Sequence, residues 1–352
     1  MVQDVSAISH SLKDYLRSIF VIKQGGKMKK YALVMVLGGI LIFSGIENVF
    51  AEETVGCPHA VGKGKFKIRG KAAYIQASKC YSDEVWKALH SSSPYSLDYD
   101  KMVDLPDGWH LRKTRIVMGL EYGIIDRLSV GALIPYVVKD LKRQVWSKQA
   151  NKTVWKEVKD NGLEDLWLSA KYLIYSKSPG LLGFDWKDGL FLAFSYKPSI
   201  SSDEKIKNGI GSGTEDFKVV ILSHPHLTEN LFLCSDVWYQ YRGRVKEIDG
   251  FSKSGWDLGD KFGYRLFVGY EFDKFAIVGG PQGWIARSNK DKDGNELEDS
   301  DTYSHGIVVK LRWMPFGDEE AGSIDLGIRI LYANKTAFAA DFMSAICGRI
   351  KF

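Results

Sequence analysis

The chain has 352 residues, enough for one large domain or two of average size. Aromatic residues make up 13% of it, and 35 glycines against only 9 prolines suit many strands joined by turns. The net charge of +5 is spread along the whole sequence without a separate basic run, which excludes a nucleic-acid-binding tail and predicts no nucleic-acid partner.

The first recognisable element is an export signal at residues 28–51. Residues 28–30 are a positively charged start, residues 31–43 form an apolar run, and residues 49–51 supply small or branched side chains before a cleavage point. The apolar run is shorter than the about 20 residues of a transmembrane helix. We therefore expect a cleavable signal peptide and a mature chain that starts at Glu52.

Residues 1–27 lie upstream of this signal. A start codon assigned too early explains them best, and an extended charged region of the signal peptide is the alternative. No lipobox precedes Cys57, so a lipoprotein is not expected. Residues 52–64 are a short N-terminal segment, and residues 65–352 are the predicted β-barrel.

From residue 65 onward the sequence alternates with the period of a β-strand. In the last stretch Ile350 and Phe352 share one face, while Arg349 and Lys351 share the other. The same split into an apolar and a polar face recurs through the chain. It predicts twelve strands, near residues 65–78, 111–123, 127–139, 164–176, 188–200, 215–225, 230–244, 257–272, 274–287, 302–314, 322–333 and 338–352.

The connections between these strands alternate in length. If both termini are periplasmic, every second connection is a periplasmic turn, and those connections are the shorter ones: 124–126, 177–187, 227–229, 272–274 and 315–320. The connections between them are polar and mostly longer: 79–110, 140–163, 201–214, 245–256 and 288–301. The short connection 334–337 is the exception, because the alternation makes it extracellular.

The even strand number and the connection pattern favour an all-β fold, a transmembrane antiparallel up-and-down β-barrel of about twelve strands in the bacterial outer membrane. Several aromatic residues lie near strand ends, as an interfacial girdle requires: Tyr136, Tyr196, Tyr241, Trp313, Tyr332 and Phe352. A soluble sandwich or propeller is the competing architecture, but no repeat motif supports it.

Three motifs in this order resemble the outer-membrane "MetA-pathway of phenol degradation" family of transporters. Residues 119–136 contain GLEYG, DRLSVG and PY, residues 162–172 contain GLEDLWL and KY, and residues 211–217 read GSGTEDF. The resemblance covers about residues 60–352. The chain departs from the family's frequent patterns at 197–200, which read KPSI, and at Glu164, where glycine is common. The resemblance implies a barrel for uptake of small compounds, aromatic ones among them, and implies no particular binding residues.

The inward phase of the predicted strands carries many cations and fewer acids, and a basic lining lowers the barrier for anions. This predicts a pore for an anionic solute such as a carboxylate. The alternative is that the inner charges pair with one another and with water and only stiffen the wall. The predicted pore-lining residues are Arg115, Lys139, Lys171, Lys197, Arg242, Arg265, Lys310, Arg312, Arg329 and Arg349.

The cysteines give no metal or cofactor signature. Cys57, Cys80, Cys234 and Cys347 are widely spaced without a CxxC pair, so zinc-ribbon and haem-attachment sites have no support. In an oxidising compartment Cys57 and Cys80 could form a disulfide, while Cys234 and Cys347 suit strand positions. Residues 289–298 resemble a calcium loop only faintly, because the glycine is misplaced for an EF-hand and no helices flank it.

Catalysis is not predicted. The candidate residues are Ser304 and His305 and, elsewhere, His224 and His226, but His305 takes the outward phase of its strand. The sequence therefore predicts a passive outer-membrane channel or transporter for small solutes and no enzyme. A non-conducting barrel with a structural, adhesive or assembly role is the alternative, favoured if residues 52–64 or 80–109 plug the interior.

The same reading predicts the partners of the protein. These are outer-membrane lipid and lipopolysaccharide, a small-molecule solute, and the barrel-assembly machinery, which commonly reads a terminal aromatic residue such as Phe352.

Overall fold

The computed structural model describes residues 61–77, 79–81, 102–147, 152–177, 184–186, 189–298, 300–316, 322–335, 338–339 and 342–351. All of them belong to one compact unit, Phe43–Phe352. The upstream residues 1–27, the signal peptide at 28–51, Cys57 and Phe352 lie outside the described residues, so these predictions stay predictions.

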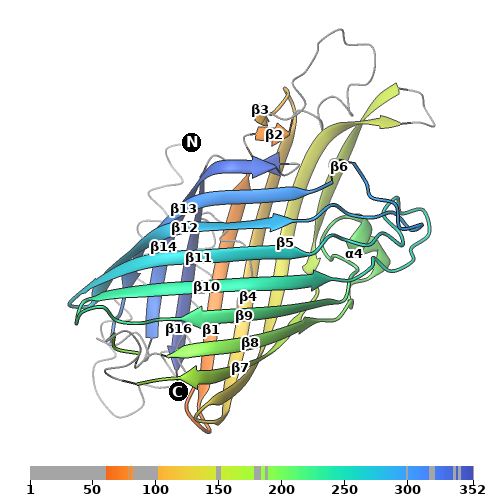
Figure 1. Cartoon of the computed structure of the whole chain (residues 1–352). Helices are drawn as coiled ribbons and strands as arrows, with labels where there is room; N and C mark the ends of the chain where they lie inside the picture. Colours follow the sequence, from red (N-terminus) through yellow and green to blue (C-terminus); the bar gives the residue numbers. More distant parts are fainter. Residues whose placement is uncertain are drawn as a thin grey trace, which may run out of the picture. The chain divides into compact units, whose positions relative to one another are not determined.

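Strands make up nearly all of the regular structure (Figure 1). The large sheet contains β1 (Phe66–Gln76), β4 (His110–Ile125), β5 (Leu128–Ser147), β6 (Lys152–Leu163), β7 (Trp167–Tyr175), β8 (Leu190–Lys197), β9 (Asp216–Ser223), β10 (Leu231–Arg242), β11 (Lys261–Phe272), β12 (Phe275–Ala286), β13 (Thr302–Trp313), β14 (Gly322–Lys335) and β16 (Phe342–Lys351). A small sheet contains β2 (Lys79–Tyr81), β3 (Met102–Asp104) and β15 (Phe338–Ala339). The helix α4 spans Asp203–Lys207.

The large sheet closes on itself. The first strand, β1, pairs with the last strand, β16, and also with β4, which pairs with β5. Twelve antiparallel strands therefore form a barrel, and β6 lies outside this circle because it pairs only with β5. Closure satisfies the edge hydrogen bonds that an open sheet would expose to lipid. The predicted up-and-down barrel of about twelve strands is confirmed.

The seam between β1 and β16 brings like charges together. Lys67 lies opposite Lys351, and Arg69 lies opposite Arg349. Directly opposite like charges destabilise a strand pair. The closing seam of the barrel therefore carries an electrostatic cost at these two pairs.

The two faces of each strand differ as the alternation predicts. On β9, Asp216, Lys218 and Val220 are buried, whereas Phe217 is 54% exposed and Ile221 is 52% exposed. Exposed apolar side chains recur on the outer face around the barrel, where lipid replaces water as their solvent. No helix within the described residues has the length and apolar character needed to cross a bilayer.

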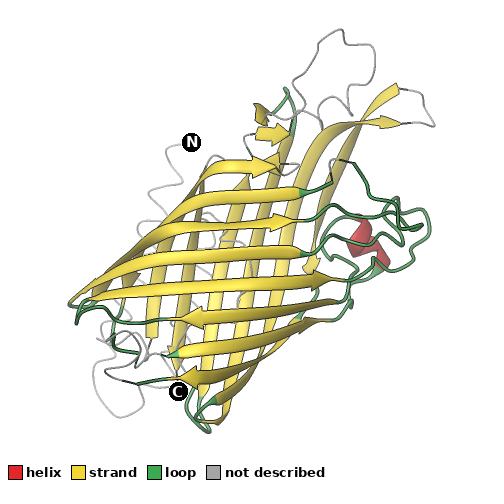
Figure 2. Cartoon of the chain, in the orientation of Figure 1, coloured by secondary structure: helices red, strands yellow, loops and turns green. Residues whose placement is uncertain are grey.

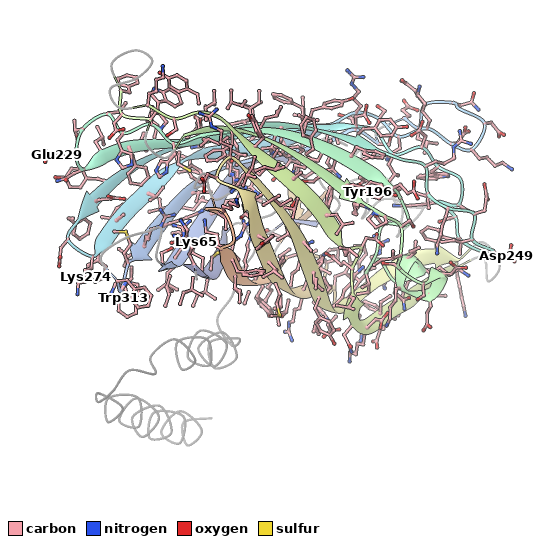
Figure 3. All side chains as sticks on the ribbon, turned by 90° about the horizontal axis from the view of Figure 1, so that it is seen from below. Lys65, Tyr196, Glu229, Asp249, Lys274 and Trp313 are labelled. Carbon is pink, nitrogen blue, oxygen red and sulfur yellow. The ribbon has the colours of Figure 1, made fainter. Side chains whose placement is uncertain are left out.

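The two ends of the barrel are unlike. One end has tight connections such as Asp273–Lys274, where Asp273 adopts a positive φ of 52° in a two-residue hairpin turn. Figure 3 places Glu229, Lys274 and Trp313 at this short-turn end and Asp249 at the other. Figure 2 shows α4 among the long loops at the other end, called here the long-loop end. Among the described connections, the short and the long ones therefore lie at opposite ends, as the alternation predicts.

The exceptional short connection 334–337 also belongs to the long-loop end. Directly after it, β15 lies outside the barrel sheet and pairs with β2, which pairs with β3 in the connection between β1 and β4. The last barrel strand therefore begins at Phe342 rather than at residue 338.

Four described elements in the predicted connections were missed: the short strands β2 and β3, the strand β6 and the helix α4. Residues 140–163 were expected to be a polar connection, but β5 continues to Ser147 and β6 returns beside it (Figure 1). Beyond the membrane both faces of this hairpin carry charges, so the apolar alternation that marks a barrel strand is absent. The helix α4 was also missed, because one turn capped by the Ser202 side chain leaves almost no periodic signal.

The described end of the N-terminal segment packs against the inner side of β4. Val61 is 1% exposed, and the N–H of Gly64 donates to the carbonyl of Gly123 at 2.8 Å. A Cβ atom on Gly123 would lie 2.2 Å from the carbonyl oxygen of Gly62, so a glycine is required there. Residues 61–65 thus narrow the interior at the short-turn end.

Candidate functional site

The interior face of the barrel is the candidate functional site. All ten predicted pore-lining cations lie on the inner phase of their strands, or on its continuation at the long-loop end. They divide into a group in the barrel wall and a group that holds loops. Their role in a pore stays a prediction.

The first wall cluster surrounds Glu121 of β4, which is 1% exposed. Its carboxylate accepts from Lys171 of β7 at 2.7 Å and from Arg69 of β1 at 2.8 Å. The hydroxyl of Ser129 donates to it at 2.6 Å. One buried acid therefore serves two cations, and this cluster keeps a surplus of positive charge.

The second wall cluster lies on β10, β11, β13 and β14. Arg312 donates to Asp325 at 2.8 Å and 3.0 Å, a two-pronged pairing, and Arg265 lies 2.5 Å from Asp236. Lys310 lies on the same inner phase of β13 as Arg312.

This cluster extends to β1 and β16. Lys310 and Arg265 act electrostatically on Lys71 of β1, and Arg349 of β16 acts on Asp325. The cations of several strands therefore converge, and the acids among them are fewer.

Arg329 is, with Lys171, the most deeply buried of these cations, at 1% exposed. It donates to the carbonyl oxygen of Ser304 at 3.2 Å and to its hydroxyl at 3.1 Å. Ser304 therefore faces inward, while His305 beside it faces outward and lies 3.2 Å from the hydroxyl of Tyr264. The two residues lie on opposite faces of β13 and do not form a catalytic pair.

An apolar wall lies beside the charges and was missed in the sequence. Phe232 and Phe267 are buried with Val308 in one cluster, and Phe191 and Trp238 are buried in another. These rings share the inward phase of their strands, so the alternation of side chains could have located them. The predicted lining, however, contained only charged residues.

Cations lie over several of these rings. The ammonium nitrogen of Lys310 lies 5.1 Å from the ring centre of Phe267, and that of Lys171 lies 5.2 Å from the ring centre of Phe191. Such contacts are favourable because the ring face is electron-rich. The inner face thus combines aromatic surface with positive charge.

Two glycines of β11 make room for this wall. Gly263 lies opposite Trp238, and Gly269 lies opposite Phe232. A Cβ atom at Gly263 would lie 2.0 Å from the indole, and one at Gly269 would lie 2.1 Å from the phenyl ring. Both rings therefore lie across the bare backbone of the neighbouring strand.

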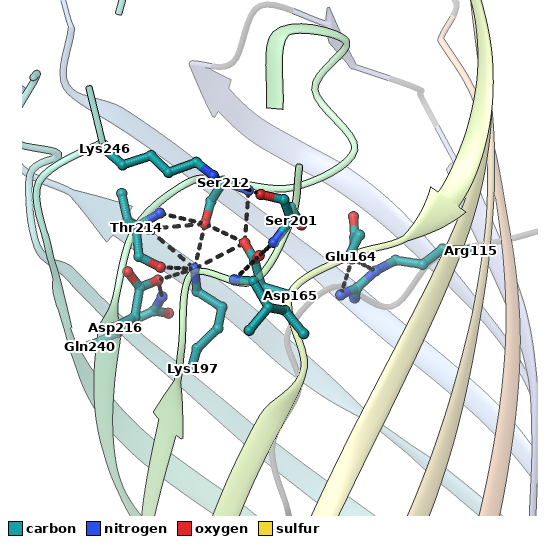
Figure 4. A network of polar contacts seen from close by, with 11 residues as sticks. Arg115, Glu164, Asp165, Lys197, Ser201, Ser212, Thr214, Asp216, Gln240 and Lys246 are labelled. Carbon is teal, nitrogen blue, oxygen red and sulfur yellow. Dashed lines mark hydrogen bonds and ion pairs between the residues drawn. The ribbon is translucent and has the colours of Figure 1, made fainter. Parts of the chain in front are cut away.

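The second group of cations anchors the long-loop end (Figure 4). Lys197 donates to the carbonyl of Thr214 at 2.7 Å and lies 3.6 Å from Asp165 and 3.4 Å from Asp216. Asp165 in turn accepts from the backbone N–H of Ser201 at 3.0 Å and of Ser212 at 2.9 Å. The network ties the loop that carries α4 to the barrel rim.

Other predicted pore residues hold neighbouring segments. Lys139 donates to the carbonyl of Asn208 at 2.9 Å, and Arg242 donates to that of Gly259 at 3.1 Å. Arg115 lies 2.5 Å from Glu164. With Lys197, these residues give the long-loop end a defined structure.

The acids of this end are held in their charged form. Burial raises the pKa of the Asp165 carboxyl, but the Lys197 charge and hydrogen bonds from Ser201 and Ser212 outweigh it, and the net pKa is lowered. For Glu164, burial is likewise outweighed by Arg115 and Lys113, and its pKa is lowered.

The faint calcium loop has an internal structure of its own. One carboxylate oxygen of Asp291 accepts from the N–H groups of Asp293 and Asn295, both at 2.9 Å. These bonds stabilise a solvated turn. Within the part of the chain that the structure describes, no group of three or more His, Cys, Asp or Glu side chains is placed to hold a metal ion.

No family model matches the sequence, and no curated protein matches it either. Among solved structures, the COG4313 outer membrane channel from Pseudomonas putida F1 matches with a TM-score of 0.59 at 13% identity, covering 86% of this chain and 100% of that one. The Ralstonia pickettii toluene transporter TbuX matches with a TM-score of 0.41 at 10% identity, covering 83% of this chain and 90% of that one.

The β domain of the Bordetella autotransporter BrkA scores 0.46 at 9% identity, covering 82% of this chain and 100% of that one. The transporter TbuX and the autotransporter BrkA have different functions but similar TM-scores below 0.5. Only the first match, at 0.59, therefore bears on the fold. The chain has the fold of a bacterial outer-membrane β-barrel.

Proposed function

We propose that the protein is a passive outer-membrane channel for small organic solutes, with a preference for anions that carry an aromatic ring. The observation that carries the proposal is the composition of the inner face, where aromatic side chains and a surplus of cations lie side by side. Cations in a low-dielectric wall attract anions, and aromatic side chains on the same face make the wall compatible with apolar solute bodies.

The names of the neighbours agree with this proposal. The P. putida protein is called an outer membrane channel and TbuX a toluene transporter. The motifs around 119–136, 162–172 and 211–217 resemble a family linked to phenol degradation, which also suggests aromatic solutes. Export through a signal at 28–51, assembly through Phe352, contact with lipopolysaccharide and a lack of catalysis belong to the same proposal.

The alternative is a barrel that does not conduct. The ion pairs of Glu121, Asp236 and Asp325 suit it, because paired charges stiffen a wall without attracting a solute. The surplus of cations over these acids favours the channel.

Ion selectivity in planar bilayers tests the proposal. Lys310→Glu reverses an inner charge while Arg312 still holds Asp325, so we expect the anion-to-cation permeability ratio to fall severalfold. The control is Lys274→Glu, which makes the same charge change in an exposed turn between β11 and β12. Unchanged selectivity in Lys310→Glu would contradict an anion-selective lumen, and a lack of any wild-type conductance would favour the structural alternative.

A further inference from the structure

The β5–β6 hairpin extends past the barrel at the long-loop end (Figure 1). β4 accompanies β5 as far as the pair His110 and Lys142, and beyond it only β5 and β6 pair. One face of the hairpin continues the inner phase of β5, through Leu141 and Arg143. The other face continues the outer phase.

The outer face has complementary charges. Lys142 lies opposite Glu157, with 2.8 Å between their charged groups, and Asp140 lies opposite Lys159. These opposite-charge pairs stabilise the two strands in the ordinary way.

The inner face has like charges at the corresponding places. Lys113 lies opposite Lys139 across β4 and β5, and Arg143 lies opposite Lys156 across β5 and β6. Lys139 experiences the charges of Lys113, Arg143 and Lys156 together, and also that of Lys253 in the loop between β10 and β11. Five cations from four segments therefore gather on one side of the hairpin.

Two acids lie beside these cations, Glu164 next to Lys113 and Asp160 opposite Lys139. Glu164 holds Lys113 at 3.2 Å and Arg115 at 2.5 Å. Asp160 pairs with Lys205 of α4 and accepts from the amide of Asn208 at 2.8 Å. The contacts of Asp160 hold α4 against β6, and backbone pairing fixes the β5–β6 register. The cations therefore extend from a well-ordered part of the protein.

We propose that this group, Lys113, Lys139, Arg143, Lys156 and Lys253, is an anion-binding site at the mouth of the barrel. It takes a solute that bears carboxylate or phosphate groups, because such a ligand offsets the repulsion between Lys113 and Lys139 and between Arg143 and Lys156. If the proposed channel function holds, the site collects the anionic solute before it enters the lumen. The inner phase of the cations directs them toward the mouth rather than toward lipid.

Calorimetric titration of the full-length refolded protein in detergent, with pyrophosphate and with benzoate as probes, tests the site. Wild-type protein should bind pyrophosphate more tightly than benzoate, with an affinity that falls as salt concentration rises. The variant Arg143→Gln/Lys156→Gln should lose about tenfold or more in pyrophosphate affinity, since charged hydrogen bonds are removed. The matched control Lys142→Gln/Lys159→Gln removes two cations from the outer face of the same two strands and should retain the affinity.

A stability measurement separates binding from a structural role. Lys156→Glu turns a like-charge pair into a complementary one, so it should keep or raise the melting temperature while it weakens pyrophosphate binding. If Arg143 and Lys156 were needed only for folding, their loss would lower the melting temperature and leave affinity in the folded fraction unchanged, which would overturn the proposal. An equal loss of pyrophosphate affinity in the two double variants would overturn it as well, because binding would then not depend on the inner face of the hairpin.

Lipopolysaccharide phosphate is the other source of the same chemistry. If Arg143→Gln/Lys156→Gln extracted from outer membranes lost the lipopolysaccharide that co-purifies with the wild type, while the refolded variant kept its pyrophosphate affinity, the assignment to a free solute would be wrong. The titration requires no conduction, so the two proposals fail separately. A protein that binds pyrophosphate but does not conduct refutes the channel, and one that conducts without binding refutes the mouth site.

Discussion

Glu121 shows at the scale of one residue how the barrel tolerates charge in its interior. Its carboxylate contacts Lys171 and Arg69 on two other strands, and Ser129 completes its hydrogen bonds. A buried ion pair contributes little net stability, but removing one partner leaves the other charge buried without compensation. The contribution of Glu121 to stability therefore depends on its contacts with Lys171 and Arg69, not only on its charge.

The substitution Glu121→Gln is expected to destabilise the barrel by about 3–5 kcal/mol, because Lys171 and Arg69 lose their counter-charge. Urea unfolding in lipid vesicles, followed by tryptophan fluorescence, measures the change. Adding Lys171→Gln to the same chain should restore part of the loss. The control is Glu157→Gln, which breaks an exposed pair with Lys142 and should leave the unfolding midpoint in place. Equal shifts in the two single variants would contradict this account.

The partners of Glu121 could not be predicted from the sequence, although its face could. Alternation assigns Glu121, Lys171 and Arg69 to the inside, but which of them meet depends on the stagger of the strands. Lys171 lies level with Ser129 of β5, and Glu121 lies level with Gly131. The contact thus crosses an intervening strand diagonally, and no local pattern encodes that geometry.

At the scale of elements, the loop that carries α4 is fixed by the Asp165 network. The loop contributes Ser201, Ser212 and Thr214, and the barrel rim contributes Lys197. The acid at the centre has a lowered pKa in the folded protein. Its stabilisation is therefore present above the unfolded pKa of about 3.9 and is lost as pH falls through the folded value.

Acid should therefore release the α4 loop while the barrel persists. Limited proteolysis with an acid-stable protease should find the loop resistant near pH 5 and cleaved once the pH falls below the lowered pKa of Asp165. Asp165→Asn should make the loop sensitive already near pH 5 and flatten the pH dependence. Asp291→Asn, in a solvated loop, is the control. A wild-type loop that stays resistant throughout would show that Asp165 does not hold it.

Elements in lipid were predictable and elements outside it were not. The outer face of a barrel strand must be apolar, so β9 and β11 can be located in the sequence within a few residues. β6 and α4 lie where water contacts both sides of the chain, and there no solvent boundary imposes a pattern. The same reason explains why the mouth site emerged only from the register of β4, β5 and β6.

At the scale of the whole molecule, two native cysteines report on the interior. Cys234 of β10 and Cys347 of β16 lie on inner phases, and neither forms a disulfide. The charges of Asp325, Lys71, Arg349 and Lys310 act on Cys347, and that of Lys310 acts on Cys234, so cations outnumber acids around Cys347. A reagent that reaches these thiols must pass through the charged interior.

A negatively charged methanethiosulfonate should therefore react with Cys234 and Cys347 faster than a positively charged one of similar size. The background is Cys57→Ser/Cys80→Ser, which leaves only these two thiols, and mass spectrometry of protein in liposomes measures the rates. Lys310→Gln should reduce the difference. Protection from both reagents would indicate a filled interior, and equal rates would contradict a net positive one.

The like-charge seam between β1 and β16 has a consequence for the kinetics of folding. The first and last strands can pair only after the other strands have curled round, so the repulsion of Lys67 from Lys351 and of Arg69 from Arg349 arises at the final step. While the seam is still open these side chains contact solvent, where dissolved salt screens their repulsion over about 10 Å at 0.1 M. Moderate salt should therefore shorten the refolding half-time more than it changes the equilibrium stability. The charges on β1 and β16 therefore limit the rate at which the barrel closes.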